Sequence, residues 1–351
     1  MQTNRNVRLH RLGSACGLGL TLLLALGWAS DMEAQAYRFE ATSTAGMHWF
    51  KGNTHTHTLN SDGDSPPEYV ARWYKEHGYD FLVLSDHNVL TDPGALGHLV
   101  DSTFIMIPGE EVTSSFQQRP VHVNGLNLSS AVEPQVGLTL VATIQQNVDA
   151  VRAVDGVPHI NHPNYRWALG AEALAQVERY RLLEIFNGHP EVNNQGGGDS
   201  PGMEEVWDIL LTSGMRVFAI AVDDAHHFQG EFGPDRVNPG RGWVVVKTRA
   251  LDAGEIMRSL ESGLFYASTG VELEDIVVTA TALEVRIKQR GDFRYTTTFI
   301  GAGGRILKRS GAIQAVYELD GPVQYVRARV TDSRGAVAWT QPVFVISKAA
   351  Q

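Results

Sequence analysis

The segment Lys51 to Asp64, KGNTHTHTLNSDGD, constrains the fold more than any other stretch of the chain. His55 and His57 are two residues apart, and on an extended strand this spacing places both imidazoles on one face. Asp62 follows in a Ser-Asp-Gly-Asp turn, which can bring its carboxylate back toward the same point. This pattern predicts a metal site, whereas an isolated pair of this kind is as often an incidental surface or core pair.

Five further polar motifs follow along the chain, and most of them come directly after an apolar run. They are Ser-Asp-His-Asn (85–88), Pro-Gly-Glu-Glu (108–111), Val-His-Val (121–123), Asn-His-Pro (161–163) and Asp-Asp-Ala-His-His (223–227). Chance placement becomes a poor explanation once the same arrangement recurs this often. The sequence therefore predicts one metal centre collected from the ends of several strands.

Short continuous apolar runs such as FLVLS (81–85) are typical of parallel strands buried on both faces. A helix with Pro66 in its first turn and Gly78 after its end separates the first two runs. Polar groups gather at the ends of the strands, which is where α/β folds place their sites. We expect an α/β fold and favour a barrel over an open sheet, because ligands from nearly every strand must reach one point. Candidate strands lie near residues 48, 81, 103, 121, 157, 182 and 217, and 242–248 adds an eighth candidate.

The pattern changes after Gly263 to short runs rich in Val, Thr, Tyr and Phe that recur about every ten residues. This texture predicts a small all-β, sandwich-like module over residues 271–351, following a larger domain over 37–270. No candidate ligand lies in the tail, so we expect packing or partner binding from it.

The N-terminus has Arg5, Arg8 and Arg11 ahead of an apolar run from Leu12 to Ala29, followed by Ala34-Gln35-Ala36. Residues 1–36 are therefore predicted to be a secretory signal peptide, with a membrane anchor as the alternative. Cleavage would give a secreted or periplasmic protein with no stable membrane span.

Composition excludes several kinds of chemistry. Cys16 is the single cysteine and would leave with the signal peptide, so disulfides, thiolate nucleophiles and Cys–zinc sites are excluded. The formal net charge is −10, which gives no broad basic surface, and we predict no binding of duplex nucleic acid. The sequence gives no indication of the oligomeric state.

The ordered set of motifs between Lys51 and about Thr248 resembles the PHP (polymerase and histidinol phosphatase) metallohydrolase superfamily. The resemblance implies a distorted seven-stranded, TIM-like β/α barrel that holds up to three divalent metals. Ser85 stands where the family has Thr, and Glu111 rather than Glu110 matches its Gly-x-Glu. The implied metal ligands are His55, His57, Asp62, His87, Glu111, His122, His162, Asp224 and His226.

Gly-Arg-Gly-Trp (240–243), Tyr-Ala-Ser-Thr-Gly (266–270) and the β-rich tail are similar to the carbaryl-hydrolase-type (CehA/McbA) branch. The superfamily mostly cleaves phosphoesters, whereas this branch is named for carbamate or amide hydrolysis. We predict a hydrolase of a small-molecule ester, with phosphoesters favoured and carbamates, amides or carboxylic esters as the alternative. A metal-dependent binding protein is the further alternative.

Six imidazoles and three carboxylates without sulfur suit two or three Zn, Mn or Fe ions better than a Ca or Mg cage. Such ions activate a water molecule and polarise the group that it attacks. Asp224 is the first candidate for positioning that water or for carrying its proton. His87 is either a ligand or an acid for the leaving group, because it cannot be both at once.

Three further residues are candidates for substrate binding. Arg119 and Arg241 could hold an anionic group, although exposed structural charges are the simpler interpretation. Asn187, which ends the run LLEIFN, could bind substrate or cap the following loop. His159 lacks a matching motif position and is expected to be a core histidine, while Glu110 is expected to be solvated.

Overall fold

The computed structural model describes residues 1–2 and 37–347, and its strands form three sheets. The α/β part of the chain contains β2 (His48–Asn53), β3 (Phe81–Val83), β4 (Ile105–Ile107), β5 (Gly109–Phe116), β6 (Arg119–Leu126), β7 (Val157–Ile160), β8 (Leu182–Asn187), β9 (Phe218–Val222), β10 (Trp243–Thr248) and β11 (Phe265–Ser268). Its helices are α2 (Pro67–Glu76), α3 (Leu140–Ala153), α4 (Ala171–Leu174), α5 (Met203–Thr212) and α6 (Ala253–Glu261), with a short 3₁₀ helix η1 (Pro93–Leu99). The predicted α/β class is thus confirmed.

A single closed seven-stranded barrel is not what the strand pairs form. The strands β10, β2, β3 and β4 lie consecutively at the end of one sheet, whereas β5 to β9 form a second sheet of five strands. Only Pro108 separates β4 from β5, and it has no N–H to continue the first ladder. β5 instead forms an antiparallel hairpin with β6, so the predicted barrel is interrupted there.

The two sheets nevertheless meet along one edge through isolated parallel bridges. Thr56 pairs with Ala225, and His87 pairs with Glu111. Both bridges lie beyond the carboxyl ends of parallel strands, β2 and β9 for the first and β3 for the second. The polar motifs of the sequence are therefore brought to the place where the two sheets join.

Two of the helices that cover these strands begin in different ways. α2 starts one residue later than the predicted helix with Pro66 in its first turn, because Pro66 is in the capping position, and no side-chain cap bond is made. α3 is capped by Thr139, whose hydroxyl accepts from the Ala142 N–H. Its buried face includes Ile144, Val148 and Val151, each worth about 1.5–3 kcal/mol on full burial.

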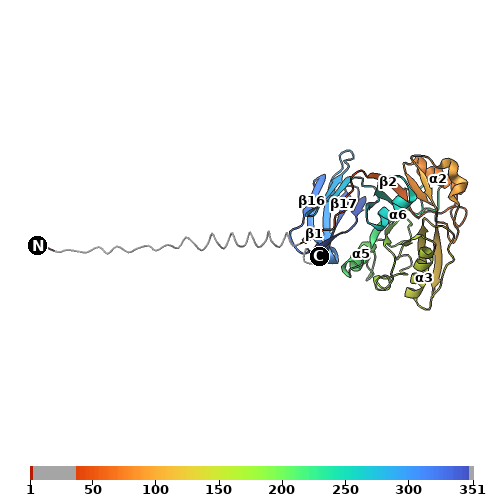
Figure 1. Cartoon of the computed structure of the whole chain (residues 1–351), viewed down its shortest axis with the longest axis horizontal. Coiled ribbons are helices and arrows are strands. Elements are labelled where there is room, and N and C mark those ends of the chain that lie inside the picture. The colour runs from red at the N-terminus through yellow and green to blue at the C-terminus, as the bar shows by residue number, and fades with distance from the viewer. Residues whose placement is uncertain (3–36, 348–351) are drawn as a thin grey trace.

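The chain beyond β11 is all β, and its strands both form a separate sheet and extend the first one. It contains β12 (Leu273–Val278), β13 (Ala282–Ile287), β14 (Tyr295–Gly301), β15 (Arg305–Ser310), β16 (Gln314–Glu318), β17 (Tyr325–Asp332), β18 (Val337–Thr340) and β19 (Val343–Ser347), with the 3₁₀ turn η2 (Ala302–Gly304). β18 pairs with β11, and β1 (Tyr37–Phe39) pairs with β19, so the first sheet runs from one part of the chain into the other. β16 and β17 lie at one end of the molecule, far from α2 and α3 (Figure 1).

Among residues 1–2 and 37–347, no helix has both the length and the apolar character needed to cross a membrane. The predicted signal peptide, apart from its first two residues, lies outside the described residues.

Candidate metal centre

The structure brings all nine predicted ligands together at the edge where the two sheets meet. They come from loops that follow β2, β3, β7 and β9 and from two positions inside the β5–β6 hairpin. Four overlapping groups have their ligand atoms within 4.8 Å of one another: His57, Asp62, His87 and His226; His55, His162 and Asp224; His55, His57 and Glu111; and His87, Glu111 and His122.

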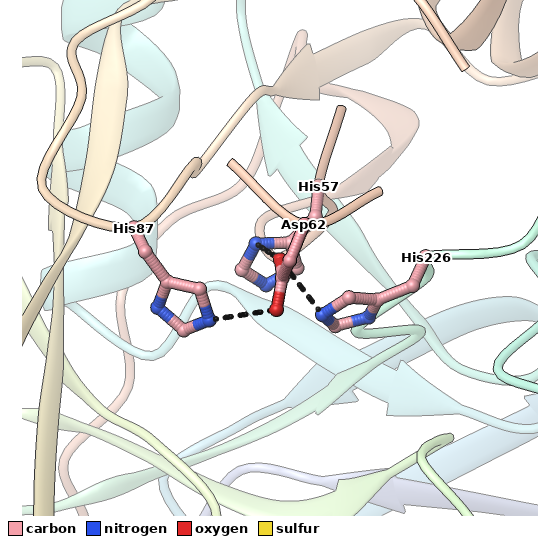
Figure 2. A group of neighbouring side chains, drawn as sticks. All are labelled: His57, Asp62, His87 and His226. Carbon is pink, nitrogen blue, oxygen red and sulfur yellow. Dashed lines mark ion pairs between the residues drawn. The ribbon is translucent and has the colours of Figure 1, made fainter. Parts of the chain in front are cut away.

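Asp62 is the centre of the first group. Figure 2 shows its carboxylate between the imidazoles of His57, His87 and His226. The Asp62 oxygens lie 3.5 Å from His57 Nδ1, 3.5 Å from His87 Nε2 and 3.3 Å from His226 Nε2. Three imidazoles around one carboxylate are a donor set that suits Zn, Mn or Fe.

Glu111 is shared between two other groups. One of its oxygens, Oε1, lies 2.9 Å from His122 Nδ1 and 3.3 Å from His162 Nε2. The other, Oε2, lies 2.9 Å from His87 Nδ1 and 3.4 Å from His57 Nε2. A carboxylate whose two oxygens face different histidines has the arrangement needed to bridge two ions.

Two buried atoms at the centre of the cluster test whether the residues fit a metal. His55 Nε2 and Glu111 Oε2 are buried and make no hydrogen bond of good geometry with the described residues, although Asp224 Oδ1 lies 3.1 Å from the first atom and His87 Nδ1 lies 2.9 Å from the second. His55 Nδ1 is 2.6 Å from Glu184 Oε1, which fixes the ring and leaves Nε2 as the ligand atom. Since unsatisfied buried polar atoms are costly, the set fits a divalent ion better than it fits a closed protein core.

The charges in the cluster depend strongly on one another. Burial raises the pKa of Glu111 and Asp224, but the surrounding histidines outweigh it and hold both carboxyls well below their usual range. Burial, with help from His226, lowers the pKa of His57 to about 4. Burial also acts to lower the pKa of His87, yet Glu111 and Asp62 outweigh it and raise that pKa to about 10.

Three residues at the cluster have backbone conformations that side chains seldom adopt. His162 has φ 23°, Asp224 has φ 51° and Asn88, beside His87, has φ 53°. Such conformations cost about 1–3 kcal/mol each and persist where the surrounding structure enforces them, often at functional sites. The two ligands are therefore aimed at the cluster at the expense of local backbone energy.

Asp86 organises the loop that carries Asp62, a role that the sequence did not reveal. Its carboxylate accepts hydrogen bonds from the Thr58 N–H (2.8 Å) and from the hydroxyls of Thr58, Ser61 and Thr91 (2.8 to 2.9 Å). The half-exposed Asp62 is consequently presented by a loop whose own conformation is fixed.

The structure gives the three candidates for substrate binding different surroundings, and only Asn187 contacts a predicted metal ligand. Asn187 donates from Nδ2 to Asp224 (3.0 Å) and to Glu184 (2.9 Å), so it orients a predicted ligand. Arg241 donates to the carbonyls of Gly188 and Gly233 and thereby holds two loops. Arg119 is exposed at the start of β6 and does not line the cavity at the cluster.

Some neighbours differ from the sequence expectation. Glu110 is buried and accepts from the Val132 N–H at 2.7 Å, because its side chain points to the opposite side of β5 from Glu111; it is not solvated. His159 is a buried core histidine, with Nε2 3.2 Å from Glu184 Oε1, and belongs to none of the ligand groups.

Three residues at the site were missed by sequence reasoning. Glu184 is fully buried and orients His55, and a carboxylate inside the apolar run LLEIFN was the signal that could have revealed it. Tyr165 and His189 line the cavity of about 100 Å³ at the cluster, next to Val192. His189 comes directly after β8, the same position relative to a strand as the predicted ligands.

No family model matches the sequence, and no curated protein matches it either. The structure is similar to that of a two-domain protein from Bacteroides vulgatus that contains a predicted PHP-like metal-dependent phosphoesterase. The identity is 15%, the TM-score is 0.50, and the match covers 84% of this chain and 93% of the other. This likeness shows a shared fold.

Two of the other similar structures match less well. A protein from Bifidobacterium adolescentis, assigned as a metal-dependent phosphoesterase, has 14% identity and a TM-score of 0.40, covering 53% of this chain and 89% of its own. An amidohydrolase from Chromobacterium violaceum has 14% identity and a TM-score of 0.34, covering 54% of this chain and 93% of its own. Neither bears on the fold at this level of similarity.

Proposed function

We propose that this chain is a metal-dependent hydrolase of the PHP superfamily that acts on phosphoesters. The observation that carries the proposal is the unsatisfied pair His55 Nε2 and Glu111 Oε2, buried where four ligand groups overlap. In a closed structural core most buried polar atoms make hydrogen bonds of good geometry. Two or three divalent ions, of Zn, Mn or Fe, would satisfy both atoms and the shared carboxylate of Glu111.

The ions would supply an activated water molecule and neutralise the charge that develops on the phosphoryl oxygens. The protein's part is to hold the ligands in fixed orientations. Glu184 fixes His55, and Asn187 holds one oxygen of Asp224 while the other faces His55 and His57 at 3.1 and 3.0 Å. The low pKa of Asp224 favours orienting a water molecule over carrying its proton.

His87 is better placed as a ligand than as an acid. Its Nδ1 lies 2.6 Å from the Thr113 hydroxyl and 2.9 Å from Glu111, and its Nε2 lies 3.5 Å from Asp62, so both ring nitrogens face protein groups and each is near a predicted ligand. An acid for the leaving group needs one nitrogen directed at the open cavity. We therefore assign His87 to the ligand set in this proposal.

The test is a direct comparison of substrates on metal-loaded protein. We expect p-nitrophenyl phosphate or a phosphodiester analogue to be turned over in Mn or Zn buffer and to lose turnover with a chelator. An uncharged naphthyl methylcarbamate gains less from adjacent cations, since its reacting group carries no net charge. A carbamate kcat/KM above that of every phosphoester would replace the proposal with the CehA/McbA-type activity. Bound metal without any hydrolysis would identify a binding protein.

We also propose that the mature protein is secreted or periplasmic, because of the arginines, apolar run and small-residue site in residues 1–36. The expected chain starts near Tyr37, and mass spectrometry of exported material measures this. Intact Met1 in a membrane fraction would support the anchor alternative.

A further inference from the structure

A second and larger cavity begins at the metal cluster. It is a groove of about 660 Å³ along the β5–β6 hairpin, and His122 lines both this groove and the cavity at the cluster. Its walls combine the exposed polar side chains of Ser115 and Gln118 with the apolar surfaces of Pro134 and Val136. A molecule whose reacting group lies at the cluster can therefore extend into the groove past His122.

Arg166 supplies the positive charge of this groove. Its guanidinium lies 5.2 Å from the ring centroid of Tyr165, and that ring lines the cavity at the cluster and lies 5.4 Å from the ring of His162. The exposed Arg166 side chain makes no salt bridge and no hydrogen bond within residues 37–347, although the chain is acidic overall, with a formal net charge of −10. Its position is set by the aromatic ring and leaves its donors open.

The backbone at the edges of the groove is in an unusual conformation on both sides. Gln117 and Gln118, at the tip of the hairpin, have φ 49° and 67°, and Arg166 and Trp167 have φ 51° and 55°. A two-residue hairpin turn of this kind normally uses Asn and Gly. Consecutive left-handed residues that are neither Gly nor Asn are uncommon, and such strain concentrates at ligand sites.

We propose that the groove binds the non-reacting part of the substrate and that Arg166 holds a second anionic group on it, a carboxylate or a phosphate. This inference rests on the proposed hydrolase function and specifies its substrate class: an organic phosphoester with a second anionic group. The planar guanidinium presents paired donors that match either oxyacid. Pro134 and Val136 would contact the apolar body between the two charged ends.

The experiment measures binding, so it does not depend on turnover. Isothermal titration of metal-loaded protein compares benzylphosphonate with its meta and para carboxylate and phosphonate derivatives, all of which resist hydrolysis. We expect at least one derivative of each kind to bind about tenfold more tightly than benzylphosphonate, as one added charge-assisted contact allows. The gain should fall with added salt. Should only one kind gain, that result would identify whether the anion is carboxylate or phosphate.

Two variants test whether Arg166 causes the gain in affinity. Arg166→Met keeps the apolar stem and should remove the gain while leaving the affinity for benzylphosphonate unchanged; Arg166→Lys should keep part of it. The matched control is Arg334→Met, because Arg334 is also exposed, also lacks a salt bridge among the described residues and lies 5.3 Å from the Phe293 ring, far along the chain in the β17–β18 turn.

The inference is overturned when no derivative binds more tightly than benzylphosphonate, or when the gain survives Arg166→Met. Hydrolysis of p-nitrophenyl phosphate in the same preparations separates the two proposals. Turnover of p-nitrophenyl phosphate without tighter binding of any derivative would reject the proposed role of the groove and leave the hydrolase proposal in place. Tighter binding of a derivative that is lost in Arg166→Met, together with no turnover of p-nitrophenyl phosphate, would support the role of the groove and reject the hydrolase proposal.

Discussion

The molecule contains two buried clusters of charged side chains, and they are satisfied to different degrees. In the first, Arg327 donates to both oxygens of Asp208 (2.8 and 2.7 Å) and to Glu204 (2.8 Å). The remaining acceptor capacity is used by the Tyr325 hydroxyl and the Trp339 indole, at 3.1 Å each. In the second, the candidate metal centre, His55 Nε2 and Glu111 Oε2 make no hydrogen bond of good geometry with the described residues, although charged groups lie within 3.1 Å of each.

The difference distinguishes a structural charge cluster from the candidate metal centre. The Arg327 cluster links α5 to strands β17 and β18, and its donors and acceptors match within the protein. The candidate metal centre gathers six imidazoles around three carboxylates from loops and strands of both sheets, and two of its buried atoms make no hydrogen bond of good geometry with the described residues. Burial of charge is therefore a poor indicator of function on its own, whereas burial with an unsatisfied remainder points to a ligand.

Removing one partner from the satisfied cluster should have the largest effect. Arg327→Met leaves Asp208 buried without its cation, and we expect a loss of about 3–5 kcal/mol in the free energy of unfolding. Urea denaturation of purified protein measures it. Arg258→Met breaks an exposed pair with Glu255 and should cost no more than about 0.5 kcal/mol. Metal content per folded molecule should be unchanged, and its loss would show that the two clusters are coupled.

Changes in the unsatisfied cluster should affect activity. His57→Ala removes a predicted ligand and Asp224→Asn removes the charge that orients water, so both should lower kcat by at least ~10²-fold. Metal content should fall in His57→Ala. Circular dichroism should show the same fold for both variants.

The control for these variants is His77→Ala, because His77 is stacked on Trp73 at 3.8 Å on the exposed side of α2, away from the cluster. It should retain its activity. Equal losses in His77→Ala and His57→Ala would mean that the assay reports general destabilisation.

Addition of metal should stabilise the protein by a smaller amount. A divalent ion at a free concentration of one hundred times its Kd adds about 2.7 kcal/mol, and a chelator should reverse this. Thermal unfolding with Zn, with Mn and with chelator measures the shift. The same shift in Arg327→Met would show that the clusters act independently, as distant sites usually do.

Sequence patterns predicted that the nine candidate ligands lie close together, whereas they did not predict how the strands pair. The proximity of these predicted ligands could be foreseen because most of their motifs follow an apolar run, and the carboxyl ends of strands meet at one edge. His57 and His226 are far apart in the chain, yet their rings lie 4.1 Å apart. The sequence predicted a closed barrel, but the strands are divided between two sheets. This division could not be predicted, because Pro108 and the β5–β6 hairpin decide which strands pair and neither alters the apolar pattern.

Contacts that depend on side-chain direction could not be predicted from the sequence either. Glu110 and Glu111 are adjacent, and only the register of β5 with β6 determines which of them faces the ligands. Asp86 and Glu184 are visible as polar residues in apolar runs, but what they orient depends on the loops around them. Asn187 was expected to meet substrate or cap a loop, and its amide instead holds Asp224, which no spacing rule could show.

The smallest expected effect is a change in the number of protons released when the protein binds metal. His87 has a pKa of about 10 in the metal-free protein, because Glu111 and Asp62 outweigh its burial, so it is protonated at pH 7. An imidazole must lose its proton to bind a metal, so uptake releases that proton and the metal affinity should rise as the pH increases toward 10. Titration calorimetry at pH 7 in two buffers of different ionisation enthalpy gives the number released. His87→Gln should release about one proton fewer per molecule, while His98→Gln, an exposed histidine on η1, should release the same number as the native chain. An unchanged count in His87→Gln would mean that His87 is not charged before the metal binds, and that Glu111 is neutralised by another member of the cluster.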